Sequence, residues 1–513
     1  MKNTYCLSKK DIEQAKRTGL TRQDVEGQLK IYLQGPVSLH LLRPCTAGDG
    51  IMSVTLAAQK RFISLFEKYS KSCTMLKFVP ASGAASRMFA EWFQAHSEGG
   101  FADYAKEEDF YRNLEKMPFA PLLKGDETAR LYFKNKNTQK LLSYILTKKG
   151  LNYGWLPKAL IHFHAYTKDA VATALEEHLV EAAAYLRDSS GRIRVHLTVS
   201  EEHARAIRAA LRRVRPALEQ EFGVRLKAQL SIQSPSTNII AVNEDLSPFY
   251  DEGGKPVFRP GGHGALLKNL QALDADFIFL KNIDNVVPRR LLKKILSYKK
   301  MLGGVAIHMQ QSVFSMLEEL DKGALPEDKI KKYADFFCEK LNGSLPPDFS
   351  DWTPARRRKK LIALLNRPLR VCGMVRNEGE PGGGPFWVEG EDATPRVQIV
   401  EAAHVHPKDK RQQKIWYGSE FFNPVDMVCC IRDFRGKKFD LEKYVDRNAY
   451  LIAEKMEKGR KLLAQELPGL WNGSMAYWNS VFVELPLMVF NPVKTVFDLL
   501  RPQHDAGGKT KFR

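Results

Sequence analysis

The sequence lacks the features that would place it among membrane, secreted or zinc-binding proteins. No part of its 513 residues forms a run of the ~18–20 apolar residues that a membrane-spanning helix needs, and residues 1–10 contain no apolar signal-peptide core. Its seven cysteines show no C-x-x-C spacing, which argues against a disulfide framework and against a thiolate zinc site. We therefore expect a cytoplasmic protein with reduced thiols and no membrane partner.

The chain carries an excess of positive charge. Its 79 lysines and arginines exceed its 59 acidic residues, which gives a formal net charge of +20. Such a balance suits a phosphorylated substrate or another polyanion, although solvated helix faces would produce most of the basic clusters. No aromatic residues interleave the basic run 356–360, and no paired Cys/His finger is present. Nucleic-acid binding therefore has no support beyond charge, and we do not expect a nucleic-acid partner.

Short apolar segments alternate with helical segments in the middle of the chain. Strands are predicted at 75–79, 160–164, 194–199, 226–233 and 276–280, and helices at 55–69, from Glu201 and at 289–301. This alternation predicts an α/β fold with a mostly parallel sheet and helices on both of its faces. Because ligands bind such sheets at the carboxyl ends of the strands, the loops after the strands are where we expect the functional residues.

The length exceeds the roughly 250–300 residues at which one hydrophobic core stops growing, so several domains are expected. The pattern divides the chain into an N-terminal helical segment (1–72), a core (73–302) with a helical insertion (about 89–155), a basic helical segment (303–368) and a C-terminal region (369–513). Within the last region, strands are predicted at 397–400 and 427–431 and a helix at 441–465.

A loop of small residues follows the first of these strands and opens a helix. It consists of Ser82, Gly83, Ala84, Ala85 and Ser86, followed by Arg87. Small residues let backbone N–H groups approach a phosphate, while a helix N-terminus and an arginine supply positive charge. The loop lacks the GK[ST] ending of a P-loop and the repeated glycines of a dinucleotide-binding loop. It is predicted to bind an anion, although a tight turn without a ligand would use the same residues.

Further motifs follow along the chain. Pro157-Lys158 places a lysine directly before a strand, residues 260–264 form a Gly-rich loop, and Asp284 follows the buried strand at 276–280. A carboxylate at the mouth of a buried strand is a common Mg²⁺ ligand, because proteins hold Mg²⁺ with one or two carboxylates plus substrate phosphates. Taken alone, Asp284 would equally well cap the turn with Asn285.

The order of these motifs resembles that of the sugar-1-phosphate nucleotidyltransferases, and most closely their UDP-sugar pyrophosphorylase branch. Ser86-Arg87-Met88 is similar to the end of the family's phosphate loop, Pro157-Lys158 resembles its Pro-Lys pair, and Asp284-Asn285 resembles its metal-binding pair. Gln233 is similar to a glutamine beside the nucleotide, and Glu401 to a glutamate that faces the sugar. Over its whole length the chain resembles a bacterial family known only as a domain of unknown function.

This resemblance implies a nucleotidyltransferase-like (GT-A/Rossmann-like) fold and a Mg²⁺-dependent enzyme. The implied reaction joins an NTP, with UTP favoured, to a sugar-1-phosphate and releases pyrophosphate. The implied catalytic residues are Arg87, Lys158 and Asp284, and the implied metal ligands are Asp284 and Asp426. The nucleotide would contact Ser82, Gly83, Ala84, Ala85, Ser86, Gln233, Gly261, Gly262, His263 and Gly264, and the sugar phosphate would contact Asn285, Glu401 and Asn423.

The sequence departs from the family pattern in ways that keep other functions open. Ala85 stands where the family has glycine, and the insertion 89–155 makes the separation between Arg87 and Lys158 unusually long. Both departures would suit a catalytically silent nucleotide-binding protein. A nucleotide-sugar-dependent glycosyltransferase is a further alternative, but no D-x-D motif surrounds Asp284, which argues against it.

Overall fold

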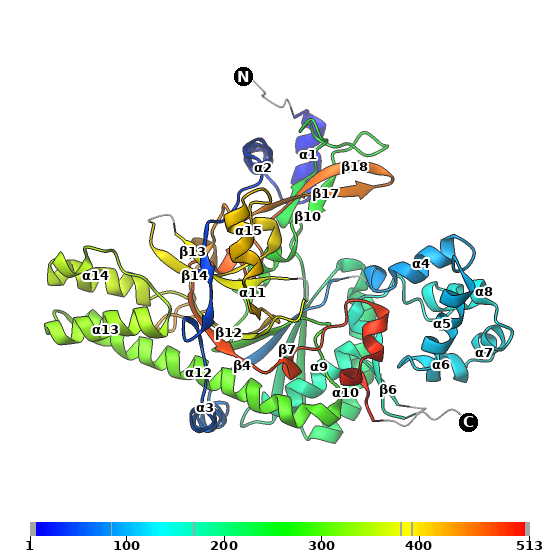
Figure 1. The fold of residues 1–513 in the computed structure, drawn as a ribbon, viewed down its shortest axis with the longest axis horizontal. Coiled ribbons are helices and arrows are strands. Elements are labelled where there is room, and N and C mark those ends of the chain that lie inside the picture. Colours follow the sequence, from blue (N-terminus) through cyan, green and yellow to red (C-terminus); the bar gives the residue numbers. More distant parts are fainter. Residues whose placement is uncertain (1–6, 84, 168–169, 380–381, 391–392, 508–513) are drawn as a thin grey trace. The chain divides into compact units, whose positions relative to one another are not determined.

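The computed structural model describes residues 7–83, 85–167, 170–379, 382–390 and 393–507 (Figure 1). The chain divides into two compact units, each built from three segments. Unit 1 comprises Met1–Leu56, Gln233–Asp276 and Val305–Glu484, and unit 2 comprises Ala57–Ile232, Phe277–Gly304 and Leu485–Arg513. The division into four consecutive segments stays a prediction.

Unit 2 contains a parallel sheet in the strand order β11-β4-β7-β8. Its strands are β4 (Met75–Pro80), β7 (Arg192–Val199), β8 (Arg225–Ile232) and β11 (Phe277–Lys281). All five residues of β11 are buried, as is typical of a parallel strand covered on both faces. The predictions of these strands, made from short apolar runs, are confirmed.

Helices of unit 2 cover the face of this sheet that carries Phe279. They are α3 (Leu56–Tyr69), α9 (Ala174–Tyr185), α10 (Glu201–Phe222) and the first part of α12 (Arg289–Lys322). Phe66 of α3 and Tyr185 of α9 both pack against Phe279, with ring centroids 6.0 and 5.3 Å away. Gly303 of α12 fits here only as glycine, because a Cβ atom would lie 2.5 Å from the Phe66 ring.

A buried ionic cluster lies on the same face. Lys77 and Lys281 both donate to the carboxylate of Glu181, at 2.9 and 2.6 Å, and all three side chains are at most 3% exposed. Buried charges of this kind persist only when they are paired and hydrogen-bonded. One turn before Glu181, Nε2 of His178 lies 3.1 Å from the carbonyl oxygen of Ile283. This contact of His178 anchors α9 to the backbone that immediately precedes Asp284.

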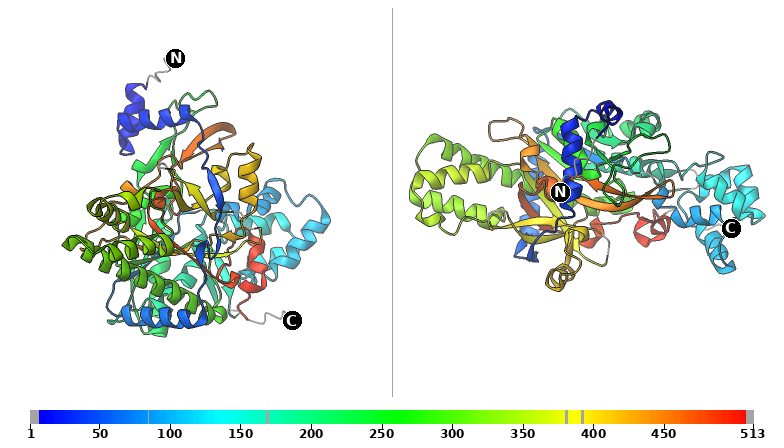
Figure 2. Two further views of the ribbon diagram at one scale, coloured as in Figure 1. Left: turned by 60° about the vertical axis from the view of Figure 1, so that its left-hand side comes forward. Right: turned by 90° about the horizontal axis from the view of Figure 1, so that it is seen from above.

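The insertion after β4 is helical and forms a separate group of helices (Figures 1 and 2). It contains α4 (Ala90–Ser97), α5 (Tyr104–Leu114), α6 (Ala120–Gly125), α7 (Glu127–Lys134) and α8 (Thr138–Leu146). Trp92 is fully buried at its centre and meets Phe110 and Phe119 edge to face. Aromatic pairs in this geometry add stabilisation beyond the area that they bury.

The prediction that residues 160–164 join the parallel sheet is wrong. After Pro157, residues Lys158–Leu160 form the 3₁₀ turn η2, and β5 (His162–Ala165) pairs antiparallel with β6 (Val171–Thr173) in a separate two-stranded sheet. His164 on β5 is tied instead to Glu177 and to His504, both by side-chain contacts. These buried polar contacts account for its position outside the apolar sheet.

Unit 1 contains strands in the order β2-β3-β19-β12-β16, of which β16 alone runs antiparallel to its neighbour β12. They are β2 (Thr46–Ala47), β3 (Gly50–Met52), β12 (Leu369–Arg376), β16 (Asp426–Cys430) and β19 (Asn479–Glu484), with β15 (Phe421–Phe422) beside β12. A second sheet pairs β1 (Leu41–Pro44), β13 (Gly384–Glu389) and β14 (Pro395–Val400). Two-stranded sheets pair β9 (Asn238–Ile240) with β10 (Phe258–Pro260) and β17 (Leu451–Glu457) with β18 (Arg460–Glu466).

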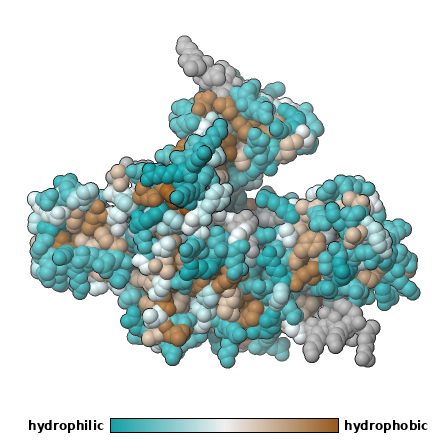
Figure 3. Space-filling view, in the orientation of Figure 1, coloured by the Kyte–Doolittle hydropathy of each residue, from teal (hydrophilic) through white to brown (hydrophobic). Residues whose placement is uncertain are grey.

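Helices surround these strands in unit 1. They are α1 (Lys9–Arg17), α2 (Arg22–Gln34), α11 (Leu267–Ala272), α13 (Glu327–Lys340), α14 (Pro354–Leu365) and α15 (Lys410–Tyr417). The surface over α13 and α14 is mostly hydrophilic (Figure 3). In the first seventy residues, which the sequence predicts as mostly helical, the short strands β1 to β3 follow α2.

The prediction of a helix at 441–465 is wrong. After the 3₁₀ turn η7 (Leu441–Tyr444), the chain forms the hairpin β17–β18. Lys458 and Gly459 at its tip both have positive φ, 47° and 79°, as tight two-residue hairpin turns require. The strongly charged segment 454–461 offers no continuous apolar stripe for a helix, and the turn residues select the hairpin.

The predicted fold class is confirmed as α/β with a largely parallel central sheet. The six described cysteines form no disulfide. Within the described ranges, none of the helices combines the length and the apolar character that crossing a bilayer requires.

Candidate functional site

Asp284 lies between two lysines just after the carboxyl end of β11. Its Oδ2 atom is 2.9 Å from Nζ of Lys158 and 3.3 Å from Nζ of Lys494. The carboxylate is 9% exposed and Lys158 is 14% exposed, whereas Lys494 is 44% exposed. We call Lys158, Asp284 and Lys494 the lysine cluster. It places two ammonium groups, one of them open to solvent, around a single buried carboxylate.

The C-terminal segment of the chain positions Lys494. The backbone N–H of Val493 donates to the carbonyl of Asp284 at 3.1 Å, and that of Asn491 donates to Oδ1 of Asn285 at 2.9 Å. Lys158 closes this contact, because its Nζ also donates to the carbonyl of Val493 at 2.8 Å. Asn285, predicted to bind the sugar phosphate, is fully buried and holds the backbone of this segment.

The predicted phosphate loop lies next to the lysine cluster, because its backbone is hydrogen-bonded to that of Lys158. Its backbone is fastened on both sides, since Ala85 N–H donates to Leu156 O at 3.1 Å and Lys158 N–H donates to Gly83 O at 3.2 Å. Ser86 and Arg87 are exposed, and Arg87 forms no side-chain hydrogen bond or ion pair with any described residue. Ala84 lies outside the described residues. The structure therefore brings Gly83, Arg87 and Lys158 to one end of the parallel sheet.

The replacement of glycine by Ala85 does not crowd the open side of this loop. The Ala85 methyl group is fully buried, so it points into the protein. A Cβ atom added to Gly83 would meet no atom within 4 Å, so the space around this exposed residue is open. The loop thus keeps room for a ligand next to its backbone.

The electrostatics of the lysine cluster favour an anionic ligand. Burial alone would raise the pKa of Asp284, but the ammonium groups of Lys158 and Lys494 hold it below its usual range. The carboxylate is therefore ionised at neutral pH and neutralises only one of the two lysines. The remaining positive charge and that of Arg87 are available for the oxygens of a phosphate group.

Asp284 has one carboxylate oxygen that could bind a metal ion, as its predicted role requires. Its Oδ1 atom accepts no hydrogen bond from the described residues, which leaves one carboxylate oxygen for a cation. The described ranges hold no group of three or more His, Cys, Asp or Glu side chains that could bind a metal by themselves. Phosphate oxygens of a substrate would have to complete such a site, as is usual for Mg²⁺.

A second group of predicted residues meets in unit 1. The His263 ring stacks on Trp471 with centroids 4.1 Å apart, and its Nε2 lies 3.8 Å from Oε1 of Glu401. Asn472 Nδ2 donates to the same Oε1 at 2.6 Å. Burial raises the pKa of Glu401, but the contacts with His263 and Asn472 bring it below its usual range. We call these four residues the His263 cluster, and its ionised carboxylate and flat ring suit contacts to polar hydroxyls and to a base.

Close packing explains the glycines of the Gly-rich loop at residues 260–264, which is predicted to contact the nucleotide. Cβ atoms added to Gly261, Gly262 and Gly264 would lie 2.6, 2.6 and 2.2 Å from atoms of Thr237, Glu466 and Pro468 respectively. Gly262 also has a positive φ of 70°. The glycines are therefore required by the fold, and their contact with a nucleotide stays a prediction. Gln233, predicted to contact the nucleotide, lies beside this loop, because its Nε2 is 3.5 Å from Oγ1 of Thr237.

Asn423 and Asp426 lie at the start of β16. The Asn423 N–H donates to the carbonyl of Gly383, and a Cβ atom on Gly383 would lie 3.4 Å from Cγ of Glu401. Asn423 is therefore a near neighbour of the His263 cluster. Asp426 is buried in unit 1 whereas Asp284 belongs to unit 2, and their joint role as metal ligands stays a prediction.

Sequence reasoning missed Lys494, Trp471 and Asn472. For Lys494 a signal was present, because Asn491-Pro492-Val493 repeats the tripeptide Asn423-Pro424-Val425 that precedes the candidate Asp426. For Trp471 and Asn472 no local motif exists, and only their contacts with His263 and Glu401 mark them.

Comparison with known proteins identifies the family of the chain. The profile of the family described as "Domain of unknown function (DUF4301)" matches residues 8–505, so the chain belongs to this family. A search of the curated proteins finds no sequence match. Among solved structures, the chain is similar to the crystal structure of the uridine diphosphate N-acetylglucosamine pyrophosphorylase from Trypanosoma brucei in complex with inhibitor. The two chains share 12% identity with a TM-score of 0.48, over 93% of this chain and 74% of that chain.

Proposed function

We propose that this protein is a cytoplasmic nucleotidyltransferase that joins an NTP, with UTP favoured, to a sugar-1-phosphate. A phosphate oxygen of the sugar phosphate attacks the α-phosphorus of the NTP, the bond from that phosphorus to the oxygen bridging to the β-phosphate breaks, and pyrophosphate leaves. The observation that carries the proposal is the lysine cluster beside the open loop at the carboxyl ends of β4 and β11. It offers the positive charge that nucleotidyl transfer needs in place of covalent chemistry.

Each residue of the site would contact a different part of the two substrates. The exposed Arg87 and the open backbone around Gly83 would bind the β- and γ-phosphates, which leave as pyrophosphate. Lys158 would hold the attacking phosphate in line, and Lys494 would neutralise charge that develops on the α-phosphate. Asp284 pairs with both ammonium groups and orients them before substrate arrives. Bound at Asp284 and the phosphates, Mg²⁺ would supply further charge neutralisation.

The His263 cluster would recognise the remaining parts of the substrates. The ionised Glu401 accepts hydrogen bonds, which suits sugar hydroxyl groups, and Asn423 lies nearby. The loop Gly261–Gly264 and Gln233 would face the base. These roles rest on the resemblance of the motifs and on the clustering of the residues in unit 1.

A catalytically silent nucleotide-binding protein is the second candidate. The observation that favours it is that the described ranges hold no group of three or more His, Cys, Asp or Glu side chains that could bind a metal ion by themselves. Such a protein would bind an NTP through the same lysines and release no pyrophosphate.

The test is a pyrophosphate-release assay with Mg²⁺ that crosses the four NTPs with a panel of sugar-1-phosphates. We expect release with one pairing, and a loss of about 100-fold or more in kcat/KM for Lys158→Ala. Lys149→Ala, an exposed lysine outside the cluster, is the matched control and should keep full activity. Silence across the panel with retained NTP binding would replace this proposal by the silent nucleotide-binding protein.

A further inference from the structure

A cavity of about 240 Å³ lies inside the helical insertion, between α5, α6 and α7 (cyan in Figure 1). Its walls are Leu114 of α5, Ala120 and Leu123 of α6, and Phe133 of α7. All of these residues belong to unit 2. The insertion departs from the pattern of the family that the sequence resembles, so neither that resemblance nor the proposed function gives this cavity a role.

The walls of the cavity are apolar. Leu114, Ala120 and Leu123 are at most 4% exposed. The ring of Phe133 packs edge to face against Tyr111, with centroids 5.5 Å apart. Protein interiors contain few voids, because an empty apolar cavity destabilises the fold in proportion to its volume. A cavity of this size and lining therefore favours an apolar occupant over water.

Three cations also line the cavity, namely Lys124 of α6 and Arg130 and Lys134 of α7. Arg130 and Lys134 are four positions apart, so they lie on one face of α7. Both are exposed, and neither side chain forms a salt bridge or a hydrogen bond with any described residue. Glu115 is the one carboxylate among the described residues of the lining, and it acts on Lys124: burial lowers the pKa of Lys124, and Glu115 opposes this shift. Arg130 and Lys134 thus keep charges that no described carboxylate compensates through an ion pair.

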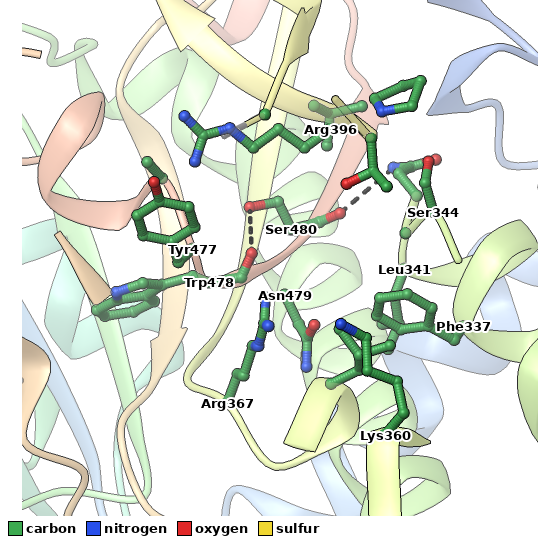
Figure 4. Close-up of a pocket in the computed structure, with 18 residues that line it drawn as sticks. Phe337, Leu341, Ser344, Lys360, Arg367, Arg396, Tyr477, Trp478, Asn479 and Ser480 are labelled. Carbon is green, nitrogen blue, oxygen red and sulfur yellow. Dashed lines mark hydrogen bonds between the residues drawn. The ribbon is translucent and has the colours of Figure 1, made fainter. Parts of the chain in front are cut away.

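The cavity in unit 1 has a different lining. Its volume is similar, about 250 Å³, but Asn479, Ser480 and Arg396 are among the residues that line it (Figure 4). Arg396 pairs with Asp446 at 2.7 Å, so its charge is already compensated. This mixed lining points to no single class of ligand.

The size and charge of the insertion cavity fit an amphiphilic anion. An apolar cavity of about 150 Å³ holds a benzene ring of six carbons, so a cavity of about 240 Å³ has room for an aliphatic chain of roughly eight to ten carbons. Arginine and lysine side chains lay their apolar stems along such a chain and keep their charged ends in water. A carboxylate at the mouth of the cavity would then pair with Arg130 and Lys134.

We propose that this cavity binds a medium-chain fatty acid, with its hydrocarbon chain between Leu114, Leu123 and Phe133 and its carboxylate beside Arg130 and Lys134. The two cations select the carboxylate form, because a neutral chain of the same length gains no ion pair from them. The site is independent of the proposed nucleotidyltransferase function, since the insertion alone forms it.

The experiment measures binding of octanoate to the full chain by calorimetry, below the concentration at which octanoate forms micelles. Octanol carries the same chain without the charge, and acetate carries the charge without the chain. Ala120→Leu adds three carbons to the cavity wall, and the matched control Ala105→Leu adds them at an exposed position of α5. Arg130→Gln with Lys134→Gln removes both charges. Its matched control is Lys116→Gln, an exposed lysine of the insertion that does not line the cavity.

We expect octanoate to bind at one site per chain, octanol to bind about tenfold more weakly, and acetate not to bind. Ala120→Leu should weaken octanoate binding about tenfold or more, because its side chain takes up the space of the ligand. The double charge variant should reduce octanoate affinity to that of octanol and leave octanol binding unchanged. Both control variants should bind like the wild type, and urea unfolding of each variant establishes that it is folded.

Equal octanoate affinity in the wild type and in folded Ala120→Leu would overturn the proposal, and so would a wild type that binds no octanoate. Equal affinity for octanoate and octanol would show that the cavity takes an uncharged ligand, and the assignment of a fatty acid would be wrong. Should Ala120→Leu fail to fold, the charge variant decides alone, because its two substituted residues are exposed. Unchanged octanoate affinity in that variant would refute the proposal.

Discussion

Lys158 and Asp284 form a nearly buried ion pair with Nζ 2.9 Å from Oδ2, although 126 positions separate them in the chain. Lys494, 210 positions after Asp284, contacts the same oxygen. The lysine cluster thus links three segments, because Asp284 follows β11, Lys158 lies in the turn before β5 and Lys494 lies in the C-terminal segment. Its members are therefore expected to affect both the stability and the activity of the protein.

Replacing Lys158 by alanine should lower the free energy of unfolding by about 1–3 kcal/mol, because the buried Asp284 loses its best-placed partner and keeps only the more exposed Lys494. Urea unfolding at pH 7 measures this change. Lys149→Ala should unfold like the wild type, and a Lys158→Ala protein as stable as this control would show that the ion pair contributes nothing.

The contribution of Asp284 to stability should depend on pH with a defined sign. The pKa of Asp284 is below its usual range in the folded protein, because Lys158 and Lys494 outweigh the effect of burial. Its stabilising effect is thus complete above the unfolded pKa of about 4 and is lost as the pH falls through the lower folded value. The difference in unfolding free energy between wild type and Asp284→Asn should therefore be largest near pH 7 and shrink below about pH 4. A difference that stays constant from pH 7 to pH 3 would contradict the ion pair.

His504 should make the protein less stable in mild acid. Burial, with the nearby His164 and Arg501, lowers the pKa of His504 to about 3, and its Nδ1 lies 3.1 Å from Nε2 of His164. Because the unfolded chain binds the proton with a pKa of about 6.5, stability is complete above that pH and falls below it.

Between pH 6 and pH 4, wild-type protein should lose up to about 1.4 kcal/mol per pH unit more than His504→Gln, which has no proton to gain. Urea unfolding at pH 4, 5, 6 and 7 compares the two proteins. Parallel stability curves would show that His504 titrates normally.

Two glycine-to-alanine substitutions should separate a packing glycine from a glycine in open space. Gly264→Ala places its methyl group 2.2 Å from the carbonyl oxygen of Pro468, so we expect a loss of about 1–3 kcal/mol in unfolding free energy. Gly83→Ala meets no atom within 4 Å and should change the unfolding free energy by less than about 0.5 kcal/mol.

On the proposed function, Gly83→Ala should still weaken NTP binding measured by calorimetry, because its methyl group occupies the space beside the phosphate loop. Full NTP affinity in a stable Gly83→Ala protein would place the phosphates elsewhere. This pair of variants serves as its own control, since only one of them perturbs the fold.

The sequence by itself determined the strands of the parallel sheet in unit 2 and the positions of the loops that follow them. A buried parallel strand is a short apolar run, and Pro80 after Val79 marks where such a run ends, so β4 and β11 could be predicted from local pattern. The position of Asp284 just after a strand end followed from the same pattern, whereas Lys158 lies in a 3₁₀ turn before β5, outside the parallel sheet. These properties depend on residues that are neighbours in the chain.

Only the tertiary structure decided which distant residues meet. Contacts between segments far apart in sequence produce the pairing of Asp284 with Lys494 and the separation of β5 from the parallel sheet. They also produce the hydrogen bond from the buried Arg370 to Ser480. The glycines at Gly261–Gly264 likewise look like a ligand loop in sequence, whereas the structure shows them packed against Glu466–Pro468. Local periodicity constrains backbone conformation, but long-range contacts depend on burial and charge pairing over the whole fold, which no short segment encodes.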